Sequence, residues 1–251
     1  MKSLQADMLT DATLRLAEAR TGDAAWEAIL RMAADIGANA VNGVGFLSES
    51  KVPVWARSSM EPAWLQEYQG AALHEVDPLV IGVGTDTLPS LLKTGRLLPC
   101  QTPDPPRDGH LHEGLRRHRY GWFISNMLMD GGPVGRFLTM SFEGDPRHAL
   151  GGGASVDGLA ALTSLFTVHL TPSDSADFAD VFGVRYGALS PREKDVLALL
   201  AHGLHNEAIA DRLGVAEVTV RMHLRHARTR MGARSREQTL ALALLRGQLS
   251  L

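Results

Sequence analysis

The sequence contains a single cysteine, Cys100, among 251 residues. One thiol cannot form an internal disulfide framework, and such low cysteine use is typical of proteins in a reducing compartment. No run of about 18 apolar residues occurs, so no membrane-spanning helix is predicted. The first residues lack a basic start followed by an apolar stretch, so we expect no secretory signal. With 45% hydrophobic residues, the chain is predicted to be a soluble, cytoplasmic globular protein without membrane contact.

Signatures of catalysis are also scarce. The sequence has no Gly-x-Ser-x-Gly turn and no Gly-x-x-x-x-Gly-Lys phosphate loop. Among its ten histidines, His110 and His112 form the closest pair. A metal-dependent lactonase would carry an Asp and another His directly afterwards, whereas this chain has Glu113 and Gly114. Cys100 has no obvious base beside it. We therefore predict no enzyme, no metal and no cofactor other than a small ligand.

What the sequence does contain is an uneven distribution of charge. Residues 185–251 hold 11 basic and 6 acidic residues, a balance of +5, whereas residues 1–184 hold 14 basic and 22 acidic ones, a balance of −8. A basic region on an acidic body indicates that only the C-terminal region approaches a polyanion.

Local signals predict four helices in this basic region. Ser190, Pro191 and Glu193 form the start of a helix with a capping box, and Gly203 is placed to end it. Further helices are predicted over 206–213, 217–231 and 235–246, with Gly214 between the second and third. Two short helices joined by a glycine-containing turn, with the more basic helix second, are typical of a helix-turn-helix.

The third of these helices carries the predicted DNA contacts. Its apolar residues recur at helical spacing on one face, and its arginines lie largely off that face. Arginine suits both phosphate oxygens and the guanine edge in the major groove. A solvated helix face is the alternative that any charge run offers. The capped helix before it and the charge contrast favour DNA binding, so we predict contacts from Thr219, Arg221, Arg225, Arg228 and Arg230.

The first part of the chain mixes helices and strands. Helices are predicted over 5–20, from Thr21 to Gly37, from Pro62 and from Asp77, with strands over 40–47 and 52–56. A loop over 102–108 and a short helix over 111–119 follow, then strands over 122–130 and 134–142 and a helix over 155–170. Helices before and after a run of strands predict a sheet covered on both faces, of the α/β class. Residues 171–180, rich in Ser, Asp and Pro, predict a linker.

The C-terminal region resembles the DNA-binding domain of LuxR-type regulators. The matching residues are Leu189-Ser190-Pro191-Arg192-Glu193, Gly203-Leu204, Glu207-Ala208-Ile209-Ala210, Thr219-Val220 with His223, and Met231-Gly232-Ala233. This resemblance implies a transcription regulator that binds double-stranded DNA. As a homodimer it would bind a roughly palindromic operator with half-sites about 10 bp apart.

The first part resembles the ligand-binding domain of quorum-sensing LuxR-type regulators. Trp64, Tyr68, Asp77-Pro78, Leu88-Pro89 and Gly121 match that family in order and spacing. The resemblance implies an α-β-α sandwich around an antiparallel sheet, hence an α+β fold, followed by an all-α four-helix domain. The implied layout is a ligand-binding and dimerisation domain over 1–172, a linker over 173–186 and a helix-turn-helix domain over 187–251.

The resemblance also implies roles in binding an acyl-homoserine lactone. The Trp64 indole would donate to the lactone carbonyl, and the Asp77 carboxylate would accept from the amide N–H. Tyr68 would pack near the acyl chain, and Thr139 would meet the acyl carbonyl. Taken singly, Trp64 and Tyr68 are better explained as core aromatics and Asp77 as a helix cap. Together, at the family spacing and followed by the DNA-binding domain, they favour a ligand pocket.

Two positions depart from the family pattern. Leu92 stands where the family has a tryptophan, and Met60 stands where a tyrosine donor is common. These changes leave a more open, more apolar head-group site. They are compatible with a different or bulkier head group, and equally with a first domain that only dimerises or binds another protein without any ligand.

Overall fold

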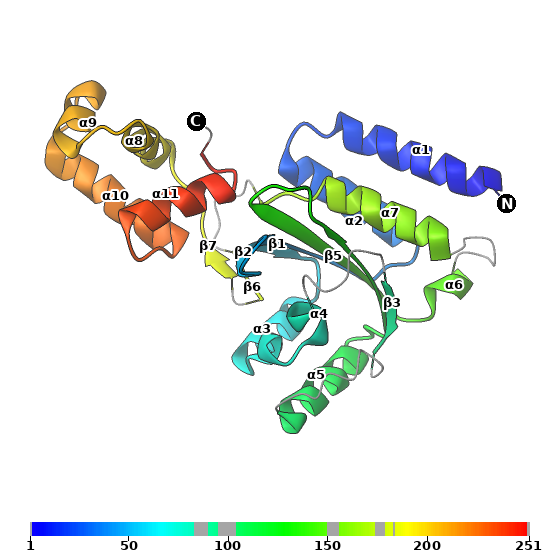
Figure 1. Cartoon of the computed structure of the whole chain (residues 1–251). Helices are drawn as coiled ribbons and strands as arrows, with labels where there is room; N and C mark the ends of the chain where they lie inside the picture. The colour runs from blue at the N-terminus through cyan, green and yellow to red at the C-terminus, as the bar shows by residue number, and fades with distance from the viewer. Residues whose placement is uncertain are drawn as a thin grey trace. The chain divides into compact units, whose positions relative to one another are not determined.

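The computed structural model describes residues 2–82, 90–94, 104–149, 156–173, 179–182 and 184–249. The chain forms two compact units, shown in Figure 1. The first comprises Met1–Ser173 with Val181–Gly183, and the second comprises Asp174–Asp180 with Val184–Leu251. The two units are described separately below.

A five-stranded sheet forms the centre of the first unit, in the order β2-β1-β5-β4-β3. Its strands are β1 (Ala40–Leu47), β2 (Pro53–Ser58), β3 (Ser90–Lys93), β4 (Trp122–Leu128) and β5 (Val134–Phe142). All four strand pairings are antiparallel. The fold is therefore α+β, and the α/β class that the element order alone suggested is wrong, because that order does not distinguish hairpins from crossovers.

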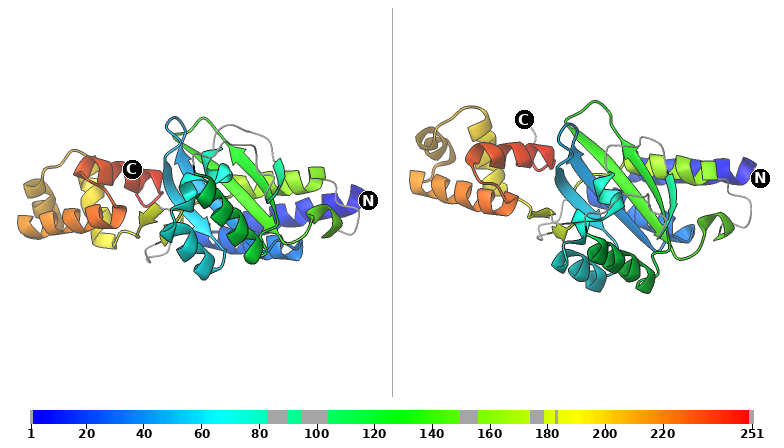
Figure 2. Two further views of the ribbon diagram at one scale, coloured as in Figure 1. Left: turned by 90° about the horizontal axis from the view of Figure 1, so that it is seen from below. Right: turned by 60° about the horizontal axis from the view of Figure 1, so that its bottom comes forward.

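Helices cover both faces of this sheet (Figures 1 and 2). One face carries α1 (Lys2–Glu18), α2 (Gly22–Asp35) and α7 (Val156–Val168). The other carries α3 (Pro62–Gly70), the short 3-10 helix η1 (Leu73–Glu75), α4 (Pro78–Ile81) and α5 (Pro105–Arg117), and α6 (Pro146–Ala149) follows β5. The predicted α-β-α sandwich is confirmed.

One boundary differs from the sequence-based expectation. Residues 102–108 were predicted as a loop, but α5 already begins at Pro105. The Asp104 side chain caps the helix by accepting from the Arg107 backbone N–H at 3.1 Å and from its guanidinium at 2.6 Å. Pro105 and Pro106, two of the prolines that suggested a loop, occupy the first turn, where their missing N–H groups are not needed.

The second unit contains the four expected helices. They are α8 (Pro191–Ala201), α9 (Asn206–Leu213), α10 (Glu217–Met231) and α11 (Arg236–Leu245). The capping box of Ser190 and Glu193 is present, and Gly214 and Gly232 end their helices with φ values of 65° and 62°. Two short strands, β6 (Ala179–Val181) and β7 (Val184–Tyr186), pair within the stretch predicted as a linker. No helix in the described ranges is long and apolar enough to cross a membrane.

Candidate functional site

A cavity of about 110 Å³ lies between the sheet and the helices α3 and α4 of the first unit. The sheet lines it with side chains from alternate positions of each strand, because successive residues of a strand point to opposite faces. These are Asn42, Val44 and Phe46 of β1, Pro53 of β2, Phe123 of β4, and Phe137 and Thr139 of β5. Most of the wall is apolar, and its few polar groups are therefore the candidates for recognising a ligand.

The buried carboxyl group of the cavity wall is that of Asp77. Its carboxylate accepts hydrogen bonds from the Tyr68 hydroxyl at 2.8 Å and from the Leu79 backbone N–H at 2.9 Å. Burial raises the pKa of Asp77 above its usual value, and these hydrogen bonds oppose the rise in part. Burial and the neighbouring Asp77 charge raise the pKa of Tyr68 well above its usual value, so its hydroxyl stays protonated and donates. Asp77 is thus both the N-cap of α4 and a partly satisfied acceptor at the cavity wall.

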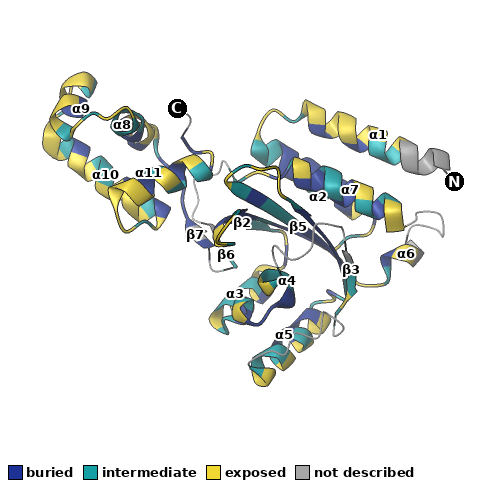
Figure 3. Ribbon diagram, in the orientation of Figure 1, coloured by how far each residue is buried: buried dark blue, intermediate teal, exposed yellow. Residues whose placement is uncertain are grey.

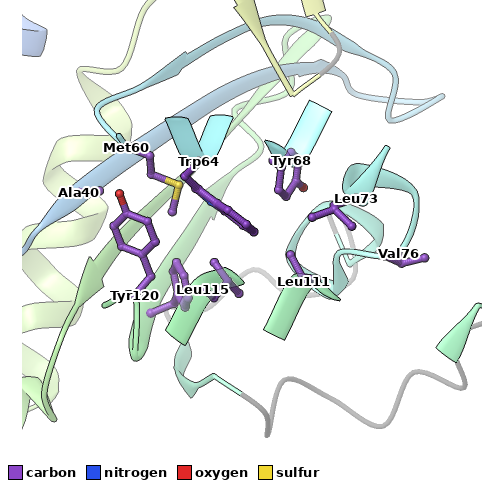
Figure 4. Packing of buried hydrophobic residues seen from close by; sticks show 10 residues of the cluster. Ala40, Met60, Trp64, Tyr68, Leu73, Val76, Leu111, Leu115 and Tyr120 are labelled. Atoms are coloured by element: carbon purple, nitrogen blue, oxygen red, sulfur yellow. The ribbon is translucent and has the colours of Figure 1, made fainter. Parts of the chain in front are cut away.

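Trp64 forms the adjacent part of the wall. Its ring is fully buried and meets Tyr68 edge to face, with 5.8 Å between ring centroids. Figure 4 shows it between Met60 and Tyr68, with Leu111 and Leu115 nearby. The indole N–H donates to none of the described residues. Because Trp64 lines the cavity, this N–H is available to a bound acceptor.

Space for the Trp64 ring depends on a glycine of α5. A Cβ atom at Gly114 would overlap Cζ3 of the indole, so only glycine fits at this position. Gly114 therefore has a packing role, which explains a helix-interior glycine that intrinsic helix propensity disfavours.

A second polar group comes from the sheet. The Asn42 side-chain amide donates to the Thr139 hydroxyl at 3.2 Å, and its carbonyl accepts from the Ser58 hydroxyl at 2.6 Å. Thr139 accepts in this arrangement and keeps its own proton for another acceptor. Asn42 and Thr139 lie opposite each other across β1 and β5.

The structure brings five of the six predicted ligand residues to one cavity, namely Met60, Trp64, Tyr68, Asp77 and Thr139. Leu92 is the exception. It lies on β3 opposite the lining residue Phe123, on the same face of the sheet, but does not itself line the cavity. The matched Leu88-Pro89 and Cys100 lie outside the described residues. Sequence reasoning missed Asn42, although a polar residue in an otherwise apolar strand was an available signal.

The two histidines of the closest pair, His110 and His112, each lie beside a carboxylate. His110 Nε2 lies 2.6 Å from a Glu67 carboxylate oxygen, and His112 Nε2 lies 3.4 Å from Asp108. Within the ranges that the structure describes, no group of three or more His, Cys, Asp or Glu side chains could hold a metal ion.

The predicted DNA-contact helix is α10. It buries Val220, Ala227 and Met231 against the rest of the unit, and Figure 3 shows that other residues along it are exposed. Helical geometry places Arg221, Arg225 and Arg228, all exposed, on one flank. These three side chains can reach a polyanion together.

Thr219 and Arg230 lie on the opposite flank of α10. Arg230 lies 3.3 Å from the buried Glu193 carboxylate and donates to the Ala188 carbonyl at 3.3 Å. Arg230 thus holds the start of α8 against α10, and the structure does not place it with the other arginines. Thr219 is partly exposed in the first turn of the helix.

Comparison with known proteins supports this assignment. The family described as "Bacterial regulatory proteins, luxR family" matches residues 187–243. The C-terminal unit is a LuxR-type helix-turn-helix domain. The nitrate/nitrite response regulator protein NarL of Escherichia coli K12 is 38% identical over 76 residues, which are 30% of this chain and 33% of NarL. The chain thus matches about a third of the length of that curated relative, within this LuxR-type domain. The family consists of regulatory proteins, which agrees with the prediction that the chain is not an enzyme.

Solved structures extend the likeness in fold to the first unit. Escherichia coli SdiA has a TM-score of 0.51 at 18% identity, over 98% of both chains. SdiA in complex with octanoyl-rac-glycerol has a TM-score of 0.52 at 18% identity, over 97% of this chain and 94% of SdiA. The N-acylhomoserine lactone dependent LuxR family factor CepR2 of Burkholderia cenocepacia has a TM-score of 0.51 at 16% identity, over 67% of this chain and 96% of CepR2. At such identities the likeness establishes the fold, a mixed helix and antiparallel-sheet domain followed by the helical LuxR-type domain.

Proposed function

We propose that this protein is a transcription regulator whose first unit binds a small amphiphile and whose LuxR-type domain binds double-stranded DNA. The cavity of the first unit carries this proposal. It combines apolar walls with a buried carboxylate at Asp77, an unpaired indole N–H at Trp64 and a free hydroxyl proton at Thr139. An acyl-homoserine lactone or a related acylated compound has the complementary groups, namely an apolar chain and a small polar head.

The head group would lie beside Trp64 and Asp77. The indole would donate to a carbonyl of the head, and the Asp77 carboxylate would accept from an amide N–H or a hydroxyl. The additional donor would favour the ionised form of Asp77, which burial disfavours. Tyr68 would act mainly through Asp77, because its hydroxyl is already engaged there.

The acyl chain would follow the sheet towards Val44, Phe46 and Phe137. Thr139, between the polar and the apolar parts of the wall, would donate to the acyl carbonyl. SdiA has been solved with octanoyl-rac-glycerol, and CepR2 is described as dependent on an N-acylhomoserine lactone. Both compounds join an acyl chain to a compact polar head, which supports the same chemical class for this chain.

A second candidate function is a ligand-independent dimerisation or protein-interaction module in place of the ligand sensor. The size of the cavity favours this candidate, because about 110 Å³ is well below the roughly 300–1,000 Å³ of typical small-molecule sites. Under our proposal the cavity expands when the ligand enters, whereas under the alternative it stays as it is.

On the DNA side, we propose that a homodimer presents two α10 helices to successive major grooves. A roughly palindromic operator with half-sites about 10 bp apart follows from two-fold symmetry. Arg221→Ala should weaken operator binding and reduce its salt dependence if the side chain contacts phosphate, or relax sequence preference if it contacts a base. A regulator of this kind would act in the cytoplasm.

Thermal unfolding with and without defined ligands tests the proposal. The probes are N-octanoyl homoserine lactone and octanoyl-rac-glycerol, added at about 100 times a micromolar Kd. Binding only to the folded state then adds about 2.7 kcal/mol, which raises Tm by roughly 5–10 °C for a domain of this size. Mass spectrometry of an organic extract of the purified protein identifies any ligand acquired during expression.

Matched variants connect such a shift to the cavity. Asp77→Asn and Trp64→Phe should each reduce the shift, whereas Asp130→Asn and Trp122→Phe, which lie outside the cavity lining, should leave it unchanged. No shift with either probe, no extracted amphiphile and operator binding by the same preparation would favour the ligand-independent module.

A further inference from the structure

Two apolar side chains stand on the solvent side of α10. Val218 is 71% exposed and Met222 is 38% exposed. Residues four apart in a helix lie one turn apart on the same face, and this face lies opposite the buried Val220, Ala227 and Met231. Because most of Val218 is exposed, its side chain is free to contact a partner of α10.

The charge around Val218 indicates what that partner is. Arg221 and Arg225 are exposed on the adjacent flank, and the Arg221 guanidinium is held by Glu217 at 2.7 Å, one turn back. Residues 185–251 carry a balance of +5. An apolar side chain beside several cations suits a polyanion that also exposes apolar groups, and duplex DNA does so in the major groove, where each thymine presents a methyl group.

We propose that Val218 contacts the C5-methyl group of a thymine at a fixed position of each operator half-site and so selects that base. This inference rests on the proposed DNA-binding function. Val218 lies in the first turn of α10, the part of a recognition helix that reaches base edges. Its two methyl groups offer no hydrogen bond, so it discriminates by apolar contact alone. Its β-branched side chain is stiff, which holds these methyl groups in place.

Replacing thymine by deoxyuridine removes only the methyl group and so tests the contact directly. The operator is first enriched from random duplexes by the full-length chain, with and without N-octanoyl homoserine lactone. Each thymine is then replaced singly by deoxyuridine. Burial of one methyl group corresponds to about a fourfold change in affinity, so wild-type protein should bind about fourfold more weakly at one thymine of each half-site. Replacement in both half-sites should weaken binding about fifteenfold if the two contacts are independent.

Variants assign this effect to Val218. Val218→Ala should bind the thymine and deoxyuridine duplexes equally well at that position and keep the salt dependence of the wild type. Val218→Thr, which keeps one methyl group, should retain part of the discrimination. Val168→Ala, at a 50% exposed valine of α7, should discriminate like the wild type.

Several results would overturn the inference. Unchanged discrimination in Val218→Ala, or an operator in which no thymine is sensitive to loss of its methyl group, would exclude the methyl contact while leaving DNA binding intact. Weaker binding of Val218→Ala to all duplexes alike, with discrimination preserved, would assign Val218 a general role or a protein contact instead. A chain that enriches no sequence and binds no duplex would refute the proposed function itself, and this inference with it.

Discussion

The hydrogen bond between Tyr68 and Asp77 should be a main support of the cavity wall. Both side chains are buried, at 2% and 8% exposure, and the hydroxyl lies 2.8 Å from the carboxylate. A hydrogen bond to a charged group contributes roughly 1.5–3 kcal/mol. Tyr68→Phe deletes only the donor, so it should destabilise the first unit by about this amount and lower its Tm by roughly 3–12 °C.

A double-mutant cycle isolates the interaction. In the Asp77→Ala background the Tyr68 hydroxyl has already lost its acceptor, so Tyr68→Phe should then change stability little. The single variant Asp77→Ala and the double variant with Tyr68→Phe both lose the α4 cap, so this loss cancels in the cycle. The coupling energy should therefore be about 1.5–3 kcal/mol.

Urea unfolding followed by tryptophan fluorescence is the appropriate assay. All four tryptophans of the chain lie in the first unit, so their emission reports on this unit alone. Tyr120→Phe is a matched control, because the Tyr120 hydroxyl accepts from the neutral Glu61 backbone N–H at 3.0 Å. It should lose about 0.5–1.5 kcal/mol without coupling to Asp77. A Tyr68–Asp77 coupling below about 0.5 kcal/mol would refute the role assigned to the pair.

Three further predictions concern neighbouring features. Gly114→Ala should lower the urea midpoint, because overlap with the Trp64 ring costs about 1–3 kcal/mol and the gain in helix propensity is only roughly 0.5–1 kcal/mol. In the Trp64→Phe background the overlap is removed, so Gly114→Ala should raise the urea midpoint. Arg225→Ala should reduce the salt dependence of operator binding without changing Tm, whereas Arg230→Ala should lower the Tm of the LuxR-type domain without changing that dependence. Folding raises the pKa of Asp77 above the value of about 3.8 that it has in the unfolded chain. The free energy of unfolding therefore falls as the pH rises from that value through the raised pKa and the carboxyl group ionises. The destabilisation by Asp77→Asn should therefore become smaller from pH 4 to pH 7 in urea titrations, and a destabilisation that grows with pH would contradict the direction of this shift.

The LuxR-type domain could be predicted closely because its signals are local. The Ser190–Glu193 capping box and the glycines that end α9 and α10 each act within a few residues. The cavity could not be predicted in the same way. Taken singly, Trp64 and Tyr68 were better explained as core aromatics, and only the family resemblance placed them beside a ligand.

Long-range pairing explains what the sequence did not reveal in the first unit. Asn42 and Thr139 meet across 97 residues, and no local pattern specifies that β1 pairs with β5. The antiparallel pairing likewise depends on which strands are neighbours, so the element order alone suggested the wrong class. Leu92 was placed at the ligand by its position after Leu88-Pro89. Strand pairing sets it opposite Phe123, a lining residue, so Leu92 shares the cavity face of the sheet but stands one strand beyond the lining.

On α10, residue type was a poorer guide than position. Arg230 was predicted to contact DNA because it is an arginine, yet its guanidinium lies against the buried Glu193 carboxylate. Val218 was overlooked because it is apolar, yet it is the more exposed of the two. Phosphate contacts supply affinity that depends on salt but not on sequence, whereas base contacts supply discrimination. If arginines such as Arg225 contact phosphate and Val218 contacts a base, changes at the arginines should alter how tightly DNA is bound and changes at Val218 should alter which DNA is bound.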